Sequence, residues 1–186
     1  MKRNILAVAV LAAMFSAPAL AMEHEGWLYN GSTGWATVNE DELDDVELAS
    51  STNLGYRWGM FGVEGGYTFF NDFEDHVDVG GTRIKTDLNV DGWTLGVNAN
   101  FDLSPRWSFQ ARGGAFFWDG DAHVSAGNVR LKVSDDGTDW YGGVALDYNW
   151  SKRASIGIAY TYYSLGGGDG FDAGLNLLGF HSEFRF

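Results

Sequence analysis

The stretch "HVS", from His123 to Ser125, contains the residue types of a hydrolase. A serine hydroxyl becomes a nucleophile when a histidine takes its proton and an acid orients that histidine, and Asp135 and Asp136 follow on the same chain. Three residues in a polar segment are a weak motif, and the simpler interpretation is an exposed histidine and serine. We therefore do not predict an enzyme, and hydrolysis at His123 and Ser125 stays an alternative.

Acidic residues cluster in the polar segments between the apolar ones. The clusters comprise Glu40, Asp41, Glu42, Asp44, Asp45 and Glu47, then Asp72, Glu74, Asp75 and Asp78 around His76, then Asp135, Asp136 and Asp139. Carboxylate oxygens suit Ca²⁺ and Mg²⁺, which could bridge to lipopolysaccharide phosphates. No cluster has the fixed ligand spacing of a known calcium loop, so we predict no metal site and no cofactor. A solvated acidic surface is the simpler interpretation.

A third set of charges alternates with apolar residues. Its members are Glu64, Arg112, Asp147, Glu183 and Arg185, with Arg57 as a further candidate near the periplasmic end. If this face lines a narrow interior, unpaired charges there would be costly. We therefore expect Arg112 and Arg185 to pair with Glu64, Asp147 and Glu183. Such pairs would either plug and stiffen the interior, which we favour, or form a narrow, gated, cation-preferring pore.

The elements that position these residues have a period of two. In "RWSFQARGGAFFW", Trp107, Phe109, Ala111 and Phe117 fall on one face, and Gln110 and Arg112 fall on the other. This alternation is typical of β-strands. Eight such segments are predicted, at 26–37, 48–58, 61–71, 84–101, 106–118, 129–150, 153–164 and 172–186.

The connections between these segments alternate between short and long. The short ones are "WGMF", "DLSPRW" and "WSKR", and the long polar ones are "NEDELDDVE", "NDFEDHVDVGGT", "DGDAHVSAGN" and "GGGDGFD". Short turns at one end and long loops at the other are typical of an outer-membrane barrel. The fold class is therefore predicted to be all-β, an eight-stranded antiparallel up-and-down transmembrane β-barrel, with both termini on the short-turn side.

Alternation alone does not say which face of the barrel points outward, since a soluble barrel would turn its apolar face inward. Large aromatics mark both ends of the apolar faces, as with Trp140 and Trp150 or Phe61 and Phe69. Two aromatic levels match the girdles of a membrane barrel. The other face is rich in small residues, which suits the narrow interior of eight strands. We therefore assign the polar face to the lumen.

The chain begins with a predicted secretory signal peptide at residues 1–21. Lys2 and Arg3 precede an apolar run, and Ala19-Leu20-Ala21 forms the cleavage site. Residues 22–186 are then the outer-membrane barrel domain. Without Lys2 and Arg3, 10 basic residues remain against 25 acids, a formal charge of −15. This acidity argues against nucleic acid as a partner, and the absence of cysteine excludes disulfides.

The chain ends in "LLGFHSEFRF" with alternate aromatics Phe180, Phe184 and Phe186. We expect these side chains to face lipid near the periplasmic rim, with Glu183 and Arg185 facing inward. The terminal phenylalanine resembles the signal by which the barrel assembly machinery recognises outer-membrane barrels for insertion.

Several stretches resemble the eight-stranded transmembrane domain of the OmpA family, with the OmpX and Ail-type small barrels as cousins. They are "GSTGWATV", "FGVEGGYTFF", "QARGGAFFW", "ALDYNW" and "EFRF". The resemblance implies luminal acid–base pairs that act as a gate, with Glu64 and Asp147 as the acids. The corresponding bases are replaced by Asn98 and Gly157. OmpA's periplasmic C-terminal domain is expected to be absent.

The "HVS" stretch resembles the His-x-Ser pattern of the lipid A deacylase PagL, although Ala126 stands where that family has asparagine. The hydrolase alternative is therefore a lipid A hydrolase. The function that we expect is structural and surface-interacting, in an OmpA-like, porin-family barrel of the cell outer membrane. The expected partners are outer-membrane lipid, lipopolysaccharide and a host or surface ligand at the loops, and the protein is expected to be a monomer.

Overall fold

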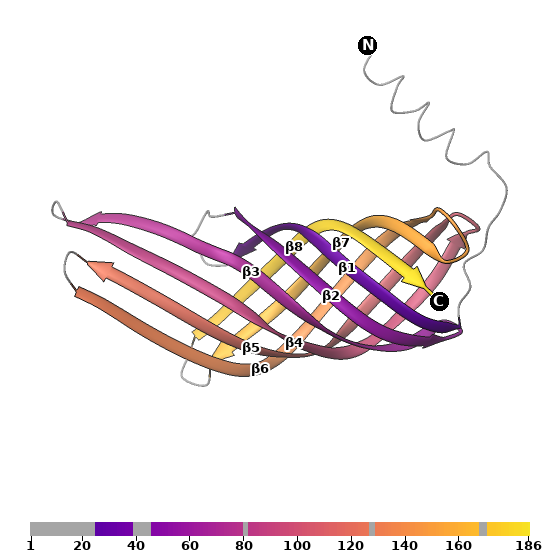
Figure 1. The fold of residues 1–186 in the computed structure, drawn as a ribbon, viewed down its shortest axis with the longest axis horizontal. Coiled ribbons are helices and arrows are strands. Elements are labelled where there is room, and N and C mark those ends of the chain that lie inside the picture. Colours follow the sequence, from indigo (N-terminus) through magenta and orange to yellow (C-terminus); the bar gives the residue numbers. More distant parts are fainter. Residues whose placement is uncertain (1–24, 39–45, 80–81, 127–128, 168–170) are drawn as a thin grey trace, which may run out of the picture.

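The computed structural model describes residues 25–38, 46–79, 82–126, 129–167 and 171–186 (Figure 1). The predicted signal peptide and the first acidic cluster up to Asp45 lie outside these residues. The side chains at 72–79, 82–88, 122–126, 129–133 and 171–173 are also outside the description, and these include His76, His123 and Ser125.

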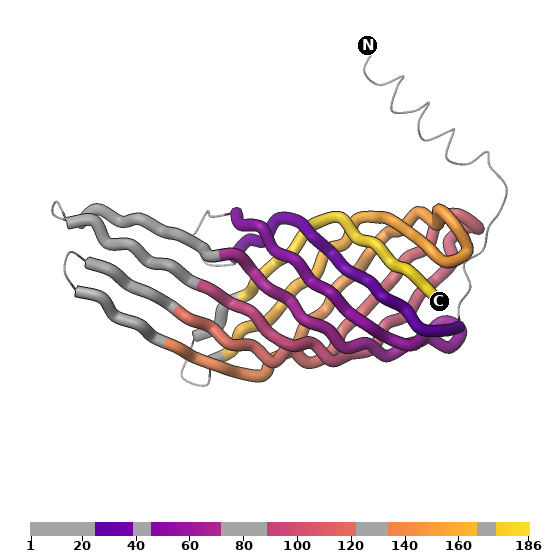
Figure 2. The backbone as a smooth tube through the Cα atoms, in the orientation of Figure 1, coloured from indigo at the N-terminus to yellow at the C-terminus, as the bar shows by residue number. Residues whose placement is uncertain are grey.

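Eight strands form one closed barrel in which each strand pairs antiparallel with the next and β1 pairs with β8. The strands are β1 (Gly26–Val38), β2 (Val46–Trp58), β3 (Phe61–Val79), β4 (Thr82–Ser104), β5 (Trp107–Ala126), β6 (Val129–Asn149), β7 (Ala154–Gly167) and β8 (Phe171–Arg185). The strands run obliquely to the long axis of the barrel, as the tube in Figure 2 shows. The predicted all-β, eight-stranded antiparallel barrel is confirmed.

Two of the predicted long loops are mostly strand, which corrects the sequence-based boundaries. Residues 72–79 continue β3, residues 82–83 begin β4, and residues 119–126 continue β5. The four strands pair with one another there and extend beyond the others at the end opposite the C-terminus (Figure 1). Outside the bilayer both faces of a sheet can meet water, so residues 72–79 and 119–126 lack the apolar alternation that marks the barrel wall. His123 and Ser125 consequently lie on β5 and not in a loop.

The turns at the other end are short because their residues suit tight connections. Gly59, between β2 and β3, has a φ of +61°, a left-handed conformation that favours glycine. The turn between β4 and β5 contains Pro105, and the Ser104 hydroxyl accepts hydrogen bonds from the backbone N–H groups of Arg106 and Trp107. Both ends of the barrel chain lie on this side, since the Phe186 N–H donates to the Trp27 carbonyl (3.0 Å).

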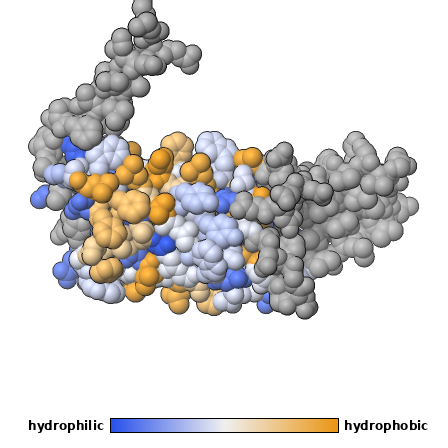
Figure 3. All heavy atoms as spheres, turned by 180° about the vertical axis from the view of Figure 1, so that it is seen from behind, coloured by the Kyte–Doolittle hydropathy of each residue, from blue (hydrophilic) through white to orange (hydrophobic). Residues whose placement is uncertain are grey.

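The apolar face of the strands points outward, as predicted. Phe180, Phe184 and Phe186 are 71%, 49% and 68% exposed, whereas Glu183 on the same strand is 1% exposed. Hydrophobic residues accordingly gather over the barrel wall in the face drawn in Figure 3. An apolar exterior around a polar interior is the arrangement of a membrane barrel and the reverse of a soluble one.

The interior has two layers. The half beside the short turns is polar and is described below. The half beside the strand extension holds an apolar cluster, which we call the aromatic plug and define as Phe70, Phe116, Trp118, Tyr141, Tyr163, Leu175 and Leu177. Tyr163 lies at its centre, with ring centroids 5.4 Å from Phe70, 5.0 Å from Phe116 and 5.9 Å from Tyr141. The alternation of polar residues predicted a polar lumen throughout, and this apolar cluster corrects that prediction.

Candidate functional site

Glu64 lies at the centre of the first luminal contact set. Strand alternation on β3 turns it inward, and its carboxylate accepts hydrogen bonds from Arg112 on β5 at 2.8 Å (Nε) and 2.5 Å (Nη2). Asn98 donates at 2.8 Å and the Tyr141 hydroxyl at 3.1 Å, while Asn30 donates at 3.4 Å. The buried carboxylate is therefore paired with one cation and solvated by neutral donors, as a charge in a narrow interior requires.

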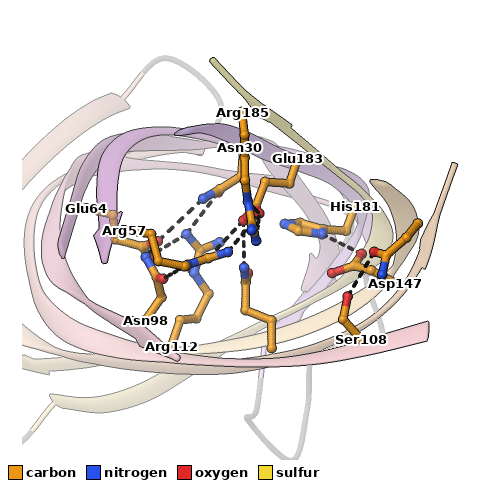
Figure 4. Close-up of polar contacts among 12 residues, drawn as sticks. Asn30, Arg57, Glu64, Asn98, Ser108, Arg112, Asp147, His181, Glu183 and Arg185 are labelled. Atoms are coloured by element: carbon orange, nitrogen blue, oxygen red, sulfur yellow. Dashed lines mark hydrogen bonds and ion pairs between the residues drawn. The ribbon is translucent and has the colours of Figure 1, made fainter. Parts of the chain in front are cut away.

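Glu183 on β8 lies at the centre of the second contact set (Figure 4). Arg57 on β2 makes a bidentate contact with it at 2.8 Å and 2.9 Å, and Arg185 donates from Nε at 2.8 Å and from Nη2 at 2.6 Å. Gln110 on β5 adds a fifth hydrogen bond at 2.7 Å. One carboxylate thus joins β2, β5 and β8 across the lumen.

Asn98 connects these two contact sets. Its side-chain oxygen accepts from Arg57 Nε (2.8 Å), and its amide nitrogen donates to Glu64 (2.8 Å). The OmpA resemblance places a base at this position. An amide is suited to the position because it accepts from a cation on one side and donates to an anion on the other, whereas a lysine would only donate.

Asp147 on β6 contacts a histidine and, among the side chains that the structure describes, no arginine, which corrects the expected pairing. Its Oδ1 lies 2.8 Å from Nδ1 of His181 on β8. Gly157 on β7 lies between them in register, and a Cβ there would come within 2.4 Å of Asp147 Oδ1 and 2.1 Å of the Leu146 carbonyl oxygen. A basic side chain, which the resemblance places at position 157, would clash with these atoms. The imidazole of His181 on β8 is the partner of Asp147 instead.

We call these residues the luminal network: Asn30, Arg57, Glu64, Asn98, Gln110, Arg112, Asp147, His181, Glu183 and Arg185. The structure brings Arg112 to Glu64 and Arg185 to Glu183, and it gives Arg57 a central place. Sequence reasoning missed His181 as a partner, although its alternation with Glu183 places it on the inward face. The charged members are at most 6% exposed, and three arginines balance three carboxylates.

Chemically, this arrangement favours rigidity over reaction. Every carboxylate of the network contacts a guanidinium group or an imidazole. Breaking one of these contacts would leave a charge unpaired in a low-dielectric interior. Tyr141 joins the network to the aromatic plug, since its hydroxyl donates to Glu64 and its ring stacks on Tyr163. Charged and apolar layers are thus in direct contact inside the barrel.

A second candidate surface lies on the outward side near the strand extension. A groove of about 150 Å³ is lined mainly by carboxylates from three strands, Asp91, Asp119, Asp121, Asp135 and Asp136. Asp121 accepts a hydrogen bond from Ser134 (2.5 Å). In the part of the chain that the structure describes, no group of three or more His, Cys, Asp or Glu residues is arranged to hold a metal ion.

Comparison with known protein families gives one match. The model for the outer membrane protein beta-barrel domain matches residues 7–184. None of the curated proteins matches the chain. Among the described residues, no helix has the length and apolar character needed to cross a membrane.

Solved structures with the same fold include three small barrels. Ail of Yersinia pestis, solved in complex with the heparin analogue sucrose octasulfate, is 21% identical with a TM-score of 0.60, over 87% of this chain and 99% of Ail. Neisserial surface protein A is 14% identical with a TM-score of 0.63, over 88% and 99%. OprG of Pseudomonas aeruginosa is 17% identical with a TM-score of 0.51, over 89% and 100%. At these identities the likeness concerns the fold.

Proposed function

Because the chain belongs to the outer membrane protein beta-barrel domain family, we propose that it serves the outer membrane as a closed, non-catalytic anchor. The barrel would stiffen the envelope and hold the β3–β6 extension at the cell surface, where it contacts a ligand. The observation that carries this proposal is that side chains occupy both halves of the lumen. The luminal network lies in one half and the aromatic plug lies in the other.

The apolar half is the more decisive layer for conduction. Phe70, Phe116 and Leu175 are at most 2% exposed, and an apolar constriction of this kind resists wetting. An ion that passed the charged half would then have to lose its hydration among aromatic rings, which is costly. The narrow gated pore is therefore the less favoured function.

The test is the conductance of the mature protein, residues 22–186, refolded into a planar bilayer at neutral pH with a salt gradient. We expect no reproducible openings when circular dichroism confirms a folded barrel. Cation-biased openings that change in Glu64→Gln or Asp147→Asn would contradict the closed anchor and support the pore. Glu64→Gln is informative because the amide keeps the size of the side chain while it removes the charge that Arg112 contacts.

The charge of the outer surface indicates which ligand it would bind. Ail was solved with a polyanion, the heparin analogue sucrose octasulfate. The acidic groove of this chain presents Asp119, Asp121, Asp135 and Asp136, which would repel a polyanion. We therefore propose a basic peptide or protein surface as the ligand, recognised by charge complementarity.

A lysine-rich peptide should bind the folded barrel at low ionic strength and should bind weakly at high salt. Replacing Asp119, Asp121, Asp135 and Asp136 by asparagine should weaken binding by about fourfold or more, since each exposed ion pair contributes about 0.2–1 kcal/mol. The matched control is neutralisation of the four acids Asp41, Glu42, Asp44 and Asp45, which changes the net charge equally. Equal losses in both variants would show attraction to net charge and would contradict a role for the groove.

A further inference from the structure

A groove of about 790 Å³ runs along the lipid-facing side of the wall and crosses β1, β2 and β5–β8. This volume is within the range of ligand pockets, about 300–1,000 Å³. Its floor consists of short side chains that lie side by side in the strand register, since Gly31 faces Thr52 on one neighbouring strand and Ser182 on the other. Larger side chains, such as Ile156 and Phe180, form its margins.

Three hydroxyls of the floor, those of Thr33, Ser50 and Thr52, make hydrogen bonds within the protein. Thr33 and Ser50 share a hydrogen bond of 2.8 Å, Ser50 donates to the Ser32 carbonyl (3.2 Å), and Thr52 donates to the Tyr29 hydroxyl (2.9 Å). These three hydroxyls therefore require no polar partner from a ligand. In a membrane, the apolar side chains that border an empty groove lose dispersion contacts unless a flexible apolar group fills the groove. An acyl chain has this shape and chemistry.

The end of the groove beside the short turns is basic. Tyr148 lines the groove, and Arg106 is held over it: Nη1 donates to the Tyr148 hydroxyl (2.9 Å), and the guanidinium lies 5.8 Å from the ring centroid. The next turn carries Lys152 and Arg153, both exposed, and the two turns are joined because the Asn149 N–H donates to the Arg106 carbonyl (2.8 Å). Three cations thus lie at the short-turn end of the groove, the end that we expect to face the periplasm.

We propose that this wall binds one anionic glycerophospholipid of the periplasmic leaflet. Its phosphate lies among Arg106, Lys152 and Arg153, and one acyl chain lies in the groove above Tyr148 and Ile156. Charge complementarity identifies the leaflet, since the opposite end of the barrel carries the acidic groove. The site goes beyond the anchor function and is independent of the lumen, because its side chains face lipid.

Native mass spectrometry of the folded barrel in detergent tests this proposal, with dioleoyl phosphatidylglycerol and dioleoyl phosphatidylcholine as probes. The wild type should retain one phosphatidylglycerol with an affinity on the order of 100-fold above phosphatidylcholine, since each basic side chain near a headgroup contributes about fivefold. The triple variant Arg106→Gln, Lys152→Gln, Arg153→Gln should lose this preference. Filling the groove with Ser182→Phe should reduce retention of both lipids.

The matched control for the groove is Val97→Phe, which adds the same ring to an exposed position on β4 outside the groove and should leave lipid retention unchanged. Equal affinity for the two lipids, or an unchanged preference in the triple variant, would overturn the proposal. Loss of binding in Val97→Phe as in Ser182→Phe would also overturn it. A protein dimer that Ser182→Phe disrupts, without a lipid adduct in the wild type, would assign the groove to a second copy of the chain.

Discussion

Replacing Glu183 by glutamine should lower the free energy of unfolding by about 3–5 kcal/mol, the usual cost of removing one partner of a buried ion pair. The carboxylate is 1% exposed and is the shared acceptor of Arg57, Arg185 and Gln110. Without it, two buried guanidinium groups face one another with no anion between them. Urea titration of the refolded barrel in lipid vesicles, followed by tryptophan fluorescence, measures the change.

Two other variants calibrate this result. Arg112→Met should cost less, about 2–3 kcal/mol, because Glu64 keeps the neutral donors Asn98, Tyr141 and Asn30. Asp136→Asn, at an exposed carboxylate, should change stability by no more than about 0.5 kcal/mol. An unchanged unfolding midpoint in both Glu183→Gln and Arg112→Met would contradict the paired lumen.

Replacing Phe116 by alanine should lower the free energy of unfolding by about 3–5 kcal/mol, as for other buried aromatics whose removal leaves a cavity. Phe116 has no exposed surface and its ring lies 5.0 Å from that of Tyr163. The surrounding strands are held by the closed ladder and cannot collapse far into the space. The same urea titration measures this loss.

The neighbouring residue Phe117 offers a matched control for this effect. It lies on the same strand, but its side chain points to the lipid and is 43% exposed. Phe117→Ala should cost about 1 kcal/mol, because lipid chains replace the contacts that the ring loses. Equal losses in Phe116→Ala and Phe117→Ala would mean that the aromatic plug adds no stability beyond that of any wall residue.

Prediction from the sequence worked best where a local repeat carried the information. Trp140, Val144 and Trp150 alternate with Tyr141, Ala145 and Asn149, and the structure separates them into an exposed and a buried face. Period-two alternation is imposed by the strand itself, so it can be counted along the chain. The extensions of β3 (72–79) and β5 (119–126) escaped prediction because their residues lie beyond the apolar wall, where alternation no longer reflects burial, whereas the segments 84–101 and 129–150 already covered most of β4 and β6.

The chemistry of the lumen depended on contacts between distant parts of the chain. Arg57 and Glu183 are separated by 126 residues, and Asp147 and His181 by 34. Strand tilt and the stagger of the closed barrel decide which inward side chains meet at one height, and neither quantity can be counted along the sequence. The exclusion of a side chain at Gly157 likewise arises from the backbone of the adjacent strand.

The amino-acid sequence by itself thus determined the number of strands, the outward face of each one and the inward charges, because each follows from residue types at a spacing of two. Only the tertiary structure decided that Glu183 holds two arginines, that His181 contacts Asp147, and that aromatic rings gather in the half of the lumen beside the strand extension. The physical reason is closure of the barrel, which brings strands together at positions set by tilt and stagger and makes every inward side chain compete for one narrow volume.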